Sequence, residues 1–535
     1  MATDDSFDNT LARDPALGQT IVIGIAVCCL MAGVVLRSMA AGDYLWLDEQ
    51  HTAWVANGDL ADVAPRAADG NQTPLFFYAC WAAVRCGGES ALSVRLPSLL
   101  CGLALMTIAA LVVYRRTLCA ASLLVVSAFF LFDYDSIFYA SEARPYAMVQ
   151  LLGVIQAAAF FGWINGVLNN TDQPGTRTGL GIATAVLAAI IFYTHPTGML
   201  LMVAELVFVV GLCLVRRKYP LAKLLTTAGV CAALILPGVI MISFVWQRRE
   251  NWSAVSDVNK VFDALATSTL VMIVFPVLLL LLDRFINKRN HAVDRGPTLS
   301  NRLLAFVACW AILPYLLIAS LDATGWLHLA IGRYAIVGAV AFPLFAAAGI
   351  ARMRSDLLRW IAAALIVGWL AYSSGVPHCL SVGGFRHENW EEVVRIINAE
   401  DESLPVFLVA NLIEDKLAES DQSQRFQRYL GFPLRGIPRV TSPERIVPRP
   451  SQGKILSSEN LALIEEKGGG LVVVRDSEVY RDPIRLEILT VLQENPRTKS
   501  AGLFVAPIQR PTPNNLHLFL IKISPSINRA TQTEN

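Results

Sequence analysis

The feature that most constrains this chain is a succession of long apolar runs. Runs of about 17 to 25 residues are long enough to cross a bilayer as helices, and the 535-residue chain is 54% hydrophobic and only 16% charged. This composition excludes a soluble globular protein. Eleven runs are predicted to span, near 20–36, 96–114, 117–134, 145–164, 179–194, 196–215, 222–245, 264–282, 303–321, 334–351 and 357–375. We therefore expect a polytopic α-helical membrane protein with about eleven transmembrane helices over residues 20–375.

Basic residues orient these spans, because loops on the cytoplasmic side carry an excess of lysine and arginine. Such residues follow alternate spans, at Arg115, Arg116, Arg177, Arg216, Arg217, Lys218, Arg284, Lys288, Arg289, Arg295, Arg352, Arg354 and Arg359. The tail 1–19 is predicted to be cytoplasmic, and the first apolar run to be a retained anchor. With eleven spans, the first outer loop 37–95 and the region 376–535 lie outside the cell. The seams at 115–116 and 194–196 are very short and require tight hairpins.

From about residue 376 the composition becomes that of a soluble domain. Residues 390–398 have helical periodicity, 405–410, 470–474 and 517–522 are typical of short buried strands, and 483–493 is predicted to be a helix. Alternating helices and strands indicate a small α/β domain over 376–535. The stretch 429–450, rich in proline and arginine, is expected to be a long loop, and 74–81 in the first outer loop is expected to be amphipathic.

Several function classes find no support. The formal net charge is +1, so nothing indicates a nucleic-acid partner. The glycines at 468–470 precede a strand instead of following one, which argues against a nucleotide site. None of the ten cysteines has zinc-ligand spacing. Cys80 and Cys86 could pair if their loop is extracytoplasmic, which the sequence leaves open.

Four polar clusters occur at the predicted outer ends of spans. They comprise Asp48-Glu49, the stretch from Asp133 and Asp135 to 141–146, residues 194–198, and 332–334. Ionisable residues at a membrane boundary indicate a functional site, and buried charges there need partners. Each cluster also has a structural interpretation, because Asp48 can cap a helix, Arg144 and Arg333 can extend to the interface, and His195 before Pro196 can occupy a turn. Their common location at one face favours a single site.

These segments carry a family resemblance. Trp46-Leu-Asp-Glu49, Tyr139-Ala-Ser-Glu-Ala-Arg-Pro-Tyr146, Thr194-His195, Arg333-Tyr334 and the Trp390-Glu-Glu segment resemble the multi-spanning GT-C glycosyltransferases. Within them, the likeness is to the group of protein O-mannosyltransferases and lipid A aminoarabinose transferases. It covers most of 20–375 and extends weakly to about 400. The resemblance implies an enzyme in the cell membrane, here a bacterial inner membrane, that transfers a sugar from a polyprenyl-phosphate carrier to a protein, lipid or glycan on the extracytoplasmic face, with inversion.

The resemblance also implies roles for residues. Asp48 matches the family's base, which takes the proton of the acceptor hydroxyl. Glu49 is expected to orient Asp48, contact the acceptor or bind a divalent ion. Arg144 and Arg333 are expected to bind the donor phosphate, with His195 as a third donor or a metal ligand. Glu142, Tyr146, Asp135 and Tyr334 are additional candidates, although neither Asp133 nor Asp135 maps onto the family pattern. A divalent cation remains open as a cofactor.

Two other function classes stay open. In a carrier or lipid flippase, the same charges would line a translocation path, but the chain shows no internal repeat of the kind many carriers contain. An inactive membrane anchor with a binding domain would explain residues 376–535 but leave the four clusters unexplained. Neither the sugar nor the acceptor follows from the sequence.

Overall fold

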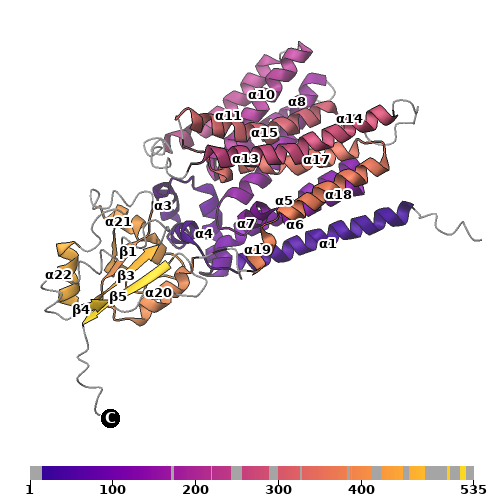
Figure 1. Cartoon of the computed structure of the whole chain (residues 1–535). Coiled ribbons are helices and arrows are strands. Elements are labelled where there is room, and N and C mark those ends of the chain that lie inside the picture. The colour runs from indigo at the N-terminus through magenta and orange to yellow at the C-terminus, as the bar shows by residue number, and fades with distance from the viewer. Residues whose placement is uncertain are drawn as a thin grey trace, which may run out of the picture.

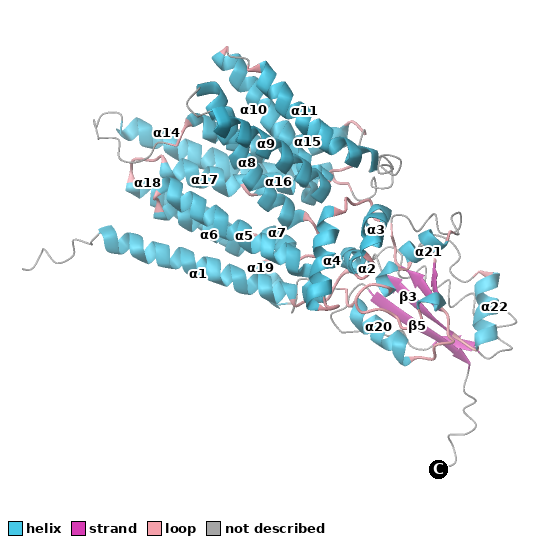
Figure 2. Ribbon diagram, turned by 180° about the vertical axis from the view of Figure 1, so that it is seen from behind, coloured by secondary structure: helices cyan, strands magenta, loops and turns pink. Residues whose placement is uncertain are grey.

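A computed structural model describes most of the chain. The described residues are 15–169, 174–217, 220–241, 256–287, 299–325, 328–381, 386, 388–412, 423–449, 457–475, 503–505 and 518–525. A bundle of long helices makes up one part, and a smaller domain built on a sheet lies at one end of it (Figures 1 and 2). The predicted helix at 483–493 lies outside the described residues.

The bundle contains the long apolar helices. They are α1 Pro15–Ala41, α5 Ala91–Thr117, α6 Ala120–Phe132, α8 Tyr146–Asn169, α9 Pro174–Thr194, α10 Leu200–Arg216, α11 Leu221–Met241, α13 Val258–Thr269, η4 Leu270–Val274, α14 Phe275–Asn287, α15 Asn301–Ala323, α17 Ala341–Ala351 and α18 Asp356–Ser373. Short helices join or extend them, namely α7 Tyr134–Ala140, η2 Pro196–Met199, η5 Gly332–Ala335, α16 Ile336–Ala339 and α19 Val376–Ser381.

Each of the eleven predicted spans coincides with helix in the structure. Within the described ranges, nine helices are long and apolar enough to cross a membrane, and α6 with α7, bent by 64°, counts as a tenth. The remaining predicted span is α9, in which Thr178–Thr194 forms a shorter apolar helix. The bend has a local cause, because the Asp133 side chain accepts a hydrogen bond from the Ser136 backbone N–H and caps α7. The predicted class, a polytopic helical membrane protein with an α/β domain, is confirmed.

The two short seams are tight, as predicted. Between α5 and α6 only Leu118 and Cys119 intervene, and Leu118 takes the left-handed conformation that ends α5. Between α9 and η2 only His195 intervenes, and its side chain accepts from the Thr197 backbone N–H. This compact turn fixes the position of the His195 ring.

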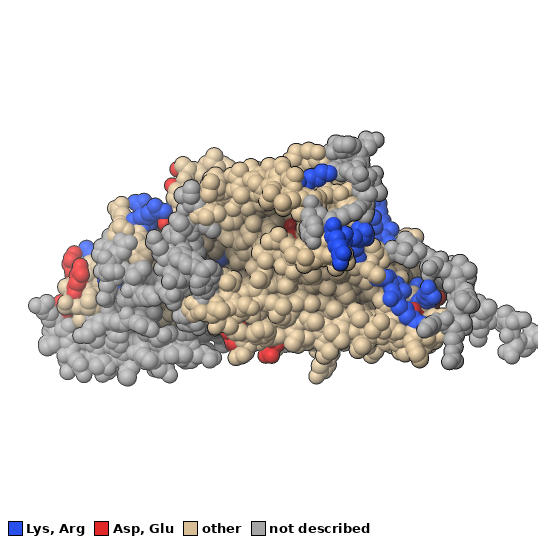
Figure 3. Space-filling view, turned by 90° about the horizontal axis from the view of Figure 1, so that it is seen from above, with Lys and Arg blue, Asp and Glu red and all other residues tan. Residues whose placement is uncertain are grey.

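On the face shown in Figure 3, the exposed basic residues of the bundle gather at its end remote from the sheet domain. Arg115 and Arg116 lie in the last turn of α5, and Arg216 and Arg284 lie in the last turns of α10 and α14. This asymmetry agrees with the charge pattern on which the predicted orientation rests. The orientation itself stays a prediction.

The first outer loop is largely helical. It contains α2 Leu47–Ala56, η1 Leu60–Asp62, α3 Val63–Asp69 and α4 Leu75–Gly87. The predicted amphipathic stretch 74–81 falls at the start of α4, whose buried face carries Phe76, Phe77, Cys80 and Val84. Cys80 and Cys86 are both free thiols in the structure.

The smaller domain has a five-stranded sheet in the order β2-β1-β3-β5-β4. Its strands are β1 Val406–Val409, β2 Ile446–Pro448, β3 Gly470–Arg475, β4 Leu503–Val505 and β5 Leu518–Pro525, with helices α20 Trp390–Ala399, α21 Gln424–Leu430 and α22 Ser458–Lys467 and turns η7 Phe432–Leu434 and η8 Pro443–Arg445. Strand β1 pairs in parallel with β2 and β3, whereas β5 runs antiparallel to both β3 and β4. The predicted helix at 390–398 and the three predicted strands are confirmed. The stretch 429–450 was predicted to be a loop, but it contains the edge strand β2, so this prediction was only partly right.

Successive side chains of β1 point to opposite faces of the sheet and belong to two separate apolar clusters. Phe407 and Val409 pack with α22, whereas Val406 and Leu408 pack with α20. The second of these clusters also contains Trp54 and Phe76 of the first outer loop. The sheet domain is therefore packed against the first outer loop through a shared apolar core, which brings both regions to the end of the bundle where Asp48 lies.

Candidate active site

Helix α2 places Asp48 and Glu49 in its first turn. Its start is favourable for acids because the N-terminus of a helix presents unpaired N–H groups and a positive dipole end. Glu49 Oε2 accepts a hydrogen bond from the Trp46 backbone N–H at 3.3 Å, which caps the helix. Successive residues of a helix point about 100° apart, so the two neighbouring carboxylates face different surroundings.

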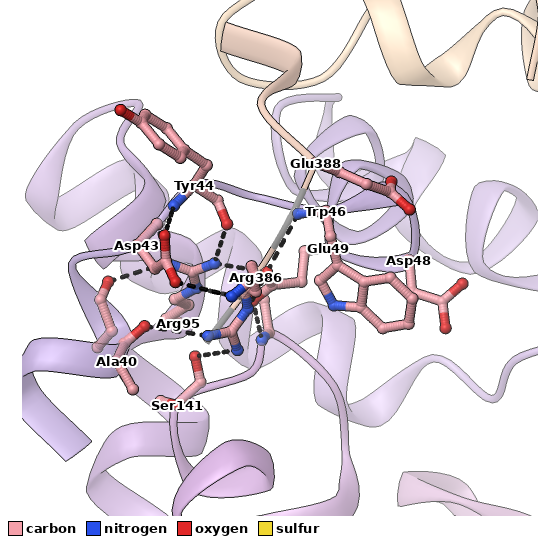
Figure 4. A network of polar contacts seen from close by, with 12 residues as sticks. Ala40, Asp43, Tyr44, Trp46, Asp48, Glu49, Arg95, Ser141, Arg386 and Glu388 are labelled. Atoms are coloured by element: carbon pink, nitrogen blue, oxygen red, sulfur yellow. Dashed lines mark hydrogen bonds and ion pairs between the residues drawn. The ribbon is translucent and has the colours of Figure 1, made fainter. Parts of the chain in front are cut away.

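Glu49 is the centre of a buried ion-pair network (Figure 4). Its Oε1 accepts from Arg95 Nε at 2.7 Å and from the Ala143 backbone N–H at 2.8 Å. Its Oε2 lies 2.5 Å from Arg95 Nη2 and 3.0 Å from Arg386 Nε. Burial would raise the pKa of the Glu49 carboxyl, but Arg386 and Arg95 outweigh burial and hold it below its ordinary value. With both oxygens engaged, Glu49 holds protein groups and not a substrate.

The same network ties distant segments together. Arg95 comes from α5 and donates to the carbonyls of Ala41 and Tyr44 at the end of the first span, at 3.0 and 2.7 Å. Arg386, from the connection to the sheet domain, donates to the Ala40 and Ser141 carbonyls, both at 3.0 Å. Figure 4 shows these groups converging on Glu49 while the Asp48 side chain points away from them.

Asp48 faces two arginines from distant spans. Its Oδ2 lies 3.1 Å from Arg333 Nη1 in η5 and 4.0 Å from Arg144 Nη2 before α8. The Asp48 side chain is 27% exposed, whereas that of Glu49 is 0% exposed. Burial would raise the pKa of Asp48, but Arg144 and Arg333 hold it below its ordinary range. Asp48 is therefore an ionised, accessible carboxylate between two guanidinium groups. The structure brings these three residues together, whereas their catalytic roles stay predictions.

Aromatic groups and His195 complete this cluster. The His195 ring lies 5.6 Å from the Tyr146 ring and 5.8 Å from the Tyr334 ring. His195 Nδ1 is 2.7 Å from Thr197 Oγ1. Burial, with Arg144 and Arg333 nearby, lowers the pKa of His195 to about 3, so the imidazole is neutral at pH 7. The structure thus brings Tyr146, His195 and Tyr334 together around the two arginines.

Glu142 is a buried carboxyl beside the site. It has no exposed surface, and neither of its side-chain oxygens has a hydrogen-bond partner among the described residues. Burial, reinforced by the charge on Glu49, raises the pKa of Glu142 to about 8. Glu142 is consequently a neutral acid at pH 7, able to donate a proton or a hydrogen bond.

Asp135 lies apart from this cluster. It is an exposed residue near the start of α7, next to the helix cap formed by the Asp133 side chain. Neither aspartate is among the charges that act on Asp48. Of the residues predicted for the site, Asp135 is therefore the one that the described structure leaves outside it.

Four charged residues that the structure places around Asp48 and Glu49 were not identified from the sequence. Arg95 and Arg386 hold Glu49, while Glu388 accepts from the Leu47 backbone N–H at 3.0 Å and from Arg475 Nε at 2.8 Å. Arg475, at the end of β3, adds a third positive charge that lowers the pKa of Asp48 after Arg144 and Arg333. A charge immediately before the predicted span 96–114 was the one available signal for Arg95. The other three come from a distant part of the chain that only folding brings to α2.

The side chains proposed as metal ligands do not fit a divalent cation. Both Glu49 oxygens are bound by arginines, and His195 faces Arg144 and Arg333. Within the described ranges, no group of three or more His, Cys, Asp or Glu is arranged to hold a metal ion. A cation at Glu49 or His195 would be repelled by the arginines beside each of them.

Comparison with known proteins identifies the fold. No family model and no curated protein matches this chain. The helical bundle, with an acidic pair after its first span and a smaller domain after its last, has the fold of the GT-C glycosyltransferases. The chain aligns over 95% of its length with 98% of ArnT from Cupriavidus metallidurans bound to undecaprenyl phosphate, at 11% identity and a TM-score of 0.50.

An oligosaccharyltransferase from Archaeoglobus fulgidus, tethered with an acceptor peptide, aligns over 92% of this chain and 73% of its own length. Its identity is 10% and its TM-score 0.42. At 11% identity, the alignment with ArnT shows a shared fold, and the GT-C resemblance seen in the sequence is confirmed at that level.

Proposed function

We propose that this protein is a membrane glycosyltransferase that moves a sugar from a polyprenyl-phosphate carrier to an acceptor on the extracytoplasmic face. The observation that carries the proposal is the Asp48 carboxylate between Arg144 and Arg333, at the end of the bundle that faces the sheet domain. Its support is the fold shared with ArnT, whose structure is bound to undecaprenyl phosphate. The proposed location is the cell membrane of a bacterium, with the sheet domain outside.

The residues supply what such a transfer needs. The acceptor oxygen forms a bond to the anomeric carbon, and its proton passes to Asp48. The bond from that carbon to the phosphate oxygen breaks, and its electron pair leaves with the polyprenyl phosphate. Guanidinium groups stabilise such a dianion by paired hydrogen bonds. We assign this role to Arg144 and Arg333, which lie beside Asp48. Attack from the side opposite the phosphate inverts the anomeric centre.

Donor binding would also activate the base. In the structure Arg144 and Arg333 keep the pKa of Asp48 low, which makes Asp48 a weak base. A phosphate dianion competes for the same two guanidinium groups. When the two arginines bind the phosphate, they interact less strongly with the Asp48 carboxylate. The pKa of Asp48 then rises, and Asp48 becomes a stronger base. Substrate binding and base activation are thereby linked through the same pair of arginines.

Neighbouring groups have supporting roles in this scheme. Glu49 fixes the start of α2, and so the direction of Asp48, through Arg95 and Arg386. Neutral His195 and Tyr334 lie beside the arginines and can donate to the phosphate without adding charge. Glu49 is therefore proposed as a positioning residue and Asp48 as the catalytic base.

The test is Asp48→Asn in the purified, reconstituted protein. Amide substitution preserves the shape of the side chain and removes the base, so we expect a loss of transfer of about a hundredfold or more. Asp59→Asn is the matched control, because Asp59 lies in the same loop with its side chain 93% exposed. The readout is sugar transferred from a radiolabelled polyprenyl-phosphate sugar to an envelope extract. Full transfer by Asp48→Asn would contradict the assignment, and donor movement across the bilayer without transfer would support the lipid flippase instead.

A further inference from the structure

A second site lies between the first outer loop and the sheet domain. A cleft of ≈ 680 Å³ is lined by Trp54 and Arg66 from the loop and by Arg425, Arg428, Arg435 and Arg439 from the domain. We call these six residues the arginine cleft. Its volume is within the range of about 300 to 1,000 Å³ typical of small-molecule sites. The cleft contains none of the residues assigned to the transfer step.

The cleft carries more positive charge than its own acids neutralise. Two acids line it, and each is already paired: Asp62 lies 2.8 Å from Arg66, and Asp69 lies 2.7 Å from Arg425. A third arginine, Arg439, reaches outward to Glu89 at a weaker 3.5 Å.

Arg428 and Arg435 remain without a carboxylate at contact distance among the described residues. Arg435 Nη2 donates to the Pro443 carbonyl at 2.7 Å, whereas its Nε is buried without a hydrogen-bond partner. Burial and the neighbouring charge of Arg428 lower the pKa of Arg435. Two guanidinium groups side by side are unfavourable unless an anion lies between them. Arg435, with its unsatisfied buried N–H, and Arg428 therefore both line the cleft without a carboxylate at contact distance among the described residues.

The position of the cleft relates it to the transfer site. Asp48 lies in the first turn of α2 and Trp54 lies six residues later, which is about 9 Å along the helix axis. Six residues also turn the helix by about 240°, so the cleft opens on a different side of α2 from Asp48. A ligand held there would be anchored away from the reacting atoms, where binding energy can still position a substrate.

We propose that the arginine cleft binds the anionic group, a phosphate or a carboxylate, of a sugar acceptor. This inference rests on the proposed function and deepens it by naming the acceptor's class as an anionic glycan or glycolipid. The donor phosphate has its own arginines at Asp48, and the cleft lies beyond the first outer loop from the bundle, against the water-facing domain. Paired guanidinium forks fit the oxygens of phosphate and carboxylate.

The experiment measures binding to the purified full-length protein in nanodiscs. Glucose 1,6-bisphosphate and inorganic phosphate are the free probes, glucose is the neutral control, and nanodiscs with and without phosphatidylglycerol form the lipid arm. We expect the bisphosphate to bind, glucose not to bind, and Arg428→Gln to weaken binding about tenfold or more. Displacement of the bisphosphate by phosphatidylglycerol would make the cleft a phospholipid-headgroup site and overturn the acceptor assignment, whereas lack of displacement would support it.

Two variants make the result decisive. Among the described residues, Arg428→Gln removes no ion pair. Arg395→Gln removes an exposed arginine of the same domain outside the cleft, so only Arg428→Gln should affect binding. Binding must persist in Asp48→Asn, which separates this site from the transfer step. Unchanged binding in Arg428→Gln, or equal binding of glucose, would overturn the cleft assignment while leaving the proposed transferase intact. Absence of sugar transfer by the wild-type protein, with anion binding retained, would overturn the proposed function alone.

Discussion

Replacing Glu49 by glutamine separates a structural acid from its catalytic neighbour. The change removes the negative charge that Arg95 and Arg386 share, and their side chains are only 0% and 1% exposed. Breaking a buried ion pair in this way costs about 3–5 kcal/mol, because the remaining charge is buried without compensation. Both arginines keep backbone carbonyl acceptors, including those of Ala41 and Ser141. We therefore expect a destabilisation near the lower end, about 3 kcal/mol.

The assay is thermal and denaturant unfolding of the detergent-purified protein, followed by tryptophan fluorescence. Glu392→Gln is the matched control, because Glu392 pairs with Arg395 on the surface, where such a pair contributes about 0–1 kcal/mol. A double variant, Glu49→Met with Arg95→Met, should recover part of the loss, since it removes both charges of one pair. A wild-type unfolding midpoint in Glu49→Gln, combined with abolished transfer, would refute the positioning role and make Glu49 a catalytic group.

Three further predictions concern the site and the membrane topology. Arg144→Lys and Arg333→Lys should each weaken donor binding, because lysine keeps the charge and loses the fork; full activity in both would indicate interface arginines instead. In the folded protein, burial and the charge of Glu49 raise the pKa of Glu142 to about 8. In the unfolded chain, the same carboxyl loses its proton above about pH 4.3. Stability should thus fall as pH rises from about 4.3 to about 8, and Glu142→Gln should flatten this decline in unfolding measurements. Accessibility tags should report Arg217 cytoplasmic and Asn71 outside, and the reverse would contradict the predicted orientation.

The positions of the helices were predictable because the signal for each is local. A helix in hydrocarbon must satisfy its own backbone hydrogen bonds and present mainly apolar side chains along its length, so each predicted span stands out in the sequence as a long, mainly apolar run. The strands at 406–409 and 470–475 were found for a related reason, since both faces of the sheet are covered and their residues are nearly all apolar. The edge strand β2 was missed, because three residues among prolines and arginines carry no such pattern.

The gathering of Asp48, Arg144, His195 and Arg333 was predicted in outline from topology. Each lies at the same predicted end of a span, and a shared face is enough to propose a shared site. The sequence alone therefore determined the membrane class, the ends at which the polar groups lie, and the candidate set.

Only the tertiary structure decided what each charge does. Asp48 and Glu49 are neighbours with the same chemistry, yet the turn of α2 directs one to an accessible site and the other into a buried network. The partners of Glu49 come from α5 and from Arg386, which lies more than three hundred positions further along the chain. Likewise, the arginine cleft exists only because the sheet domain packs on the first outer loop. Such pairings depend on long-range packing, which no local pattern of residues records, whereas helices and strands are encoded by the residues that form them.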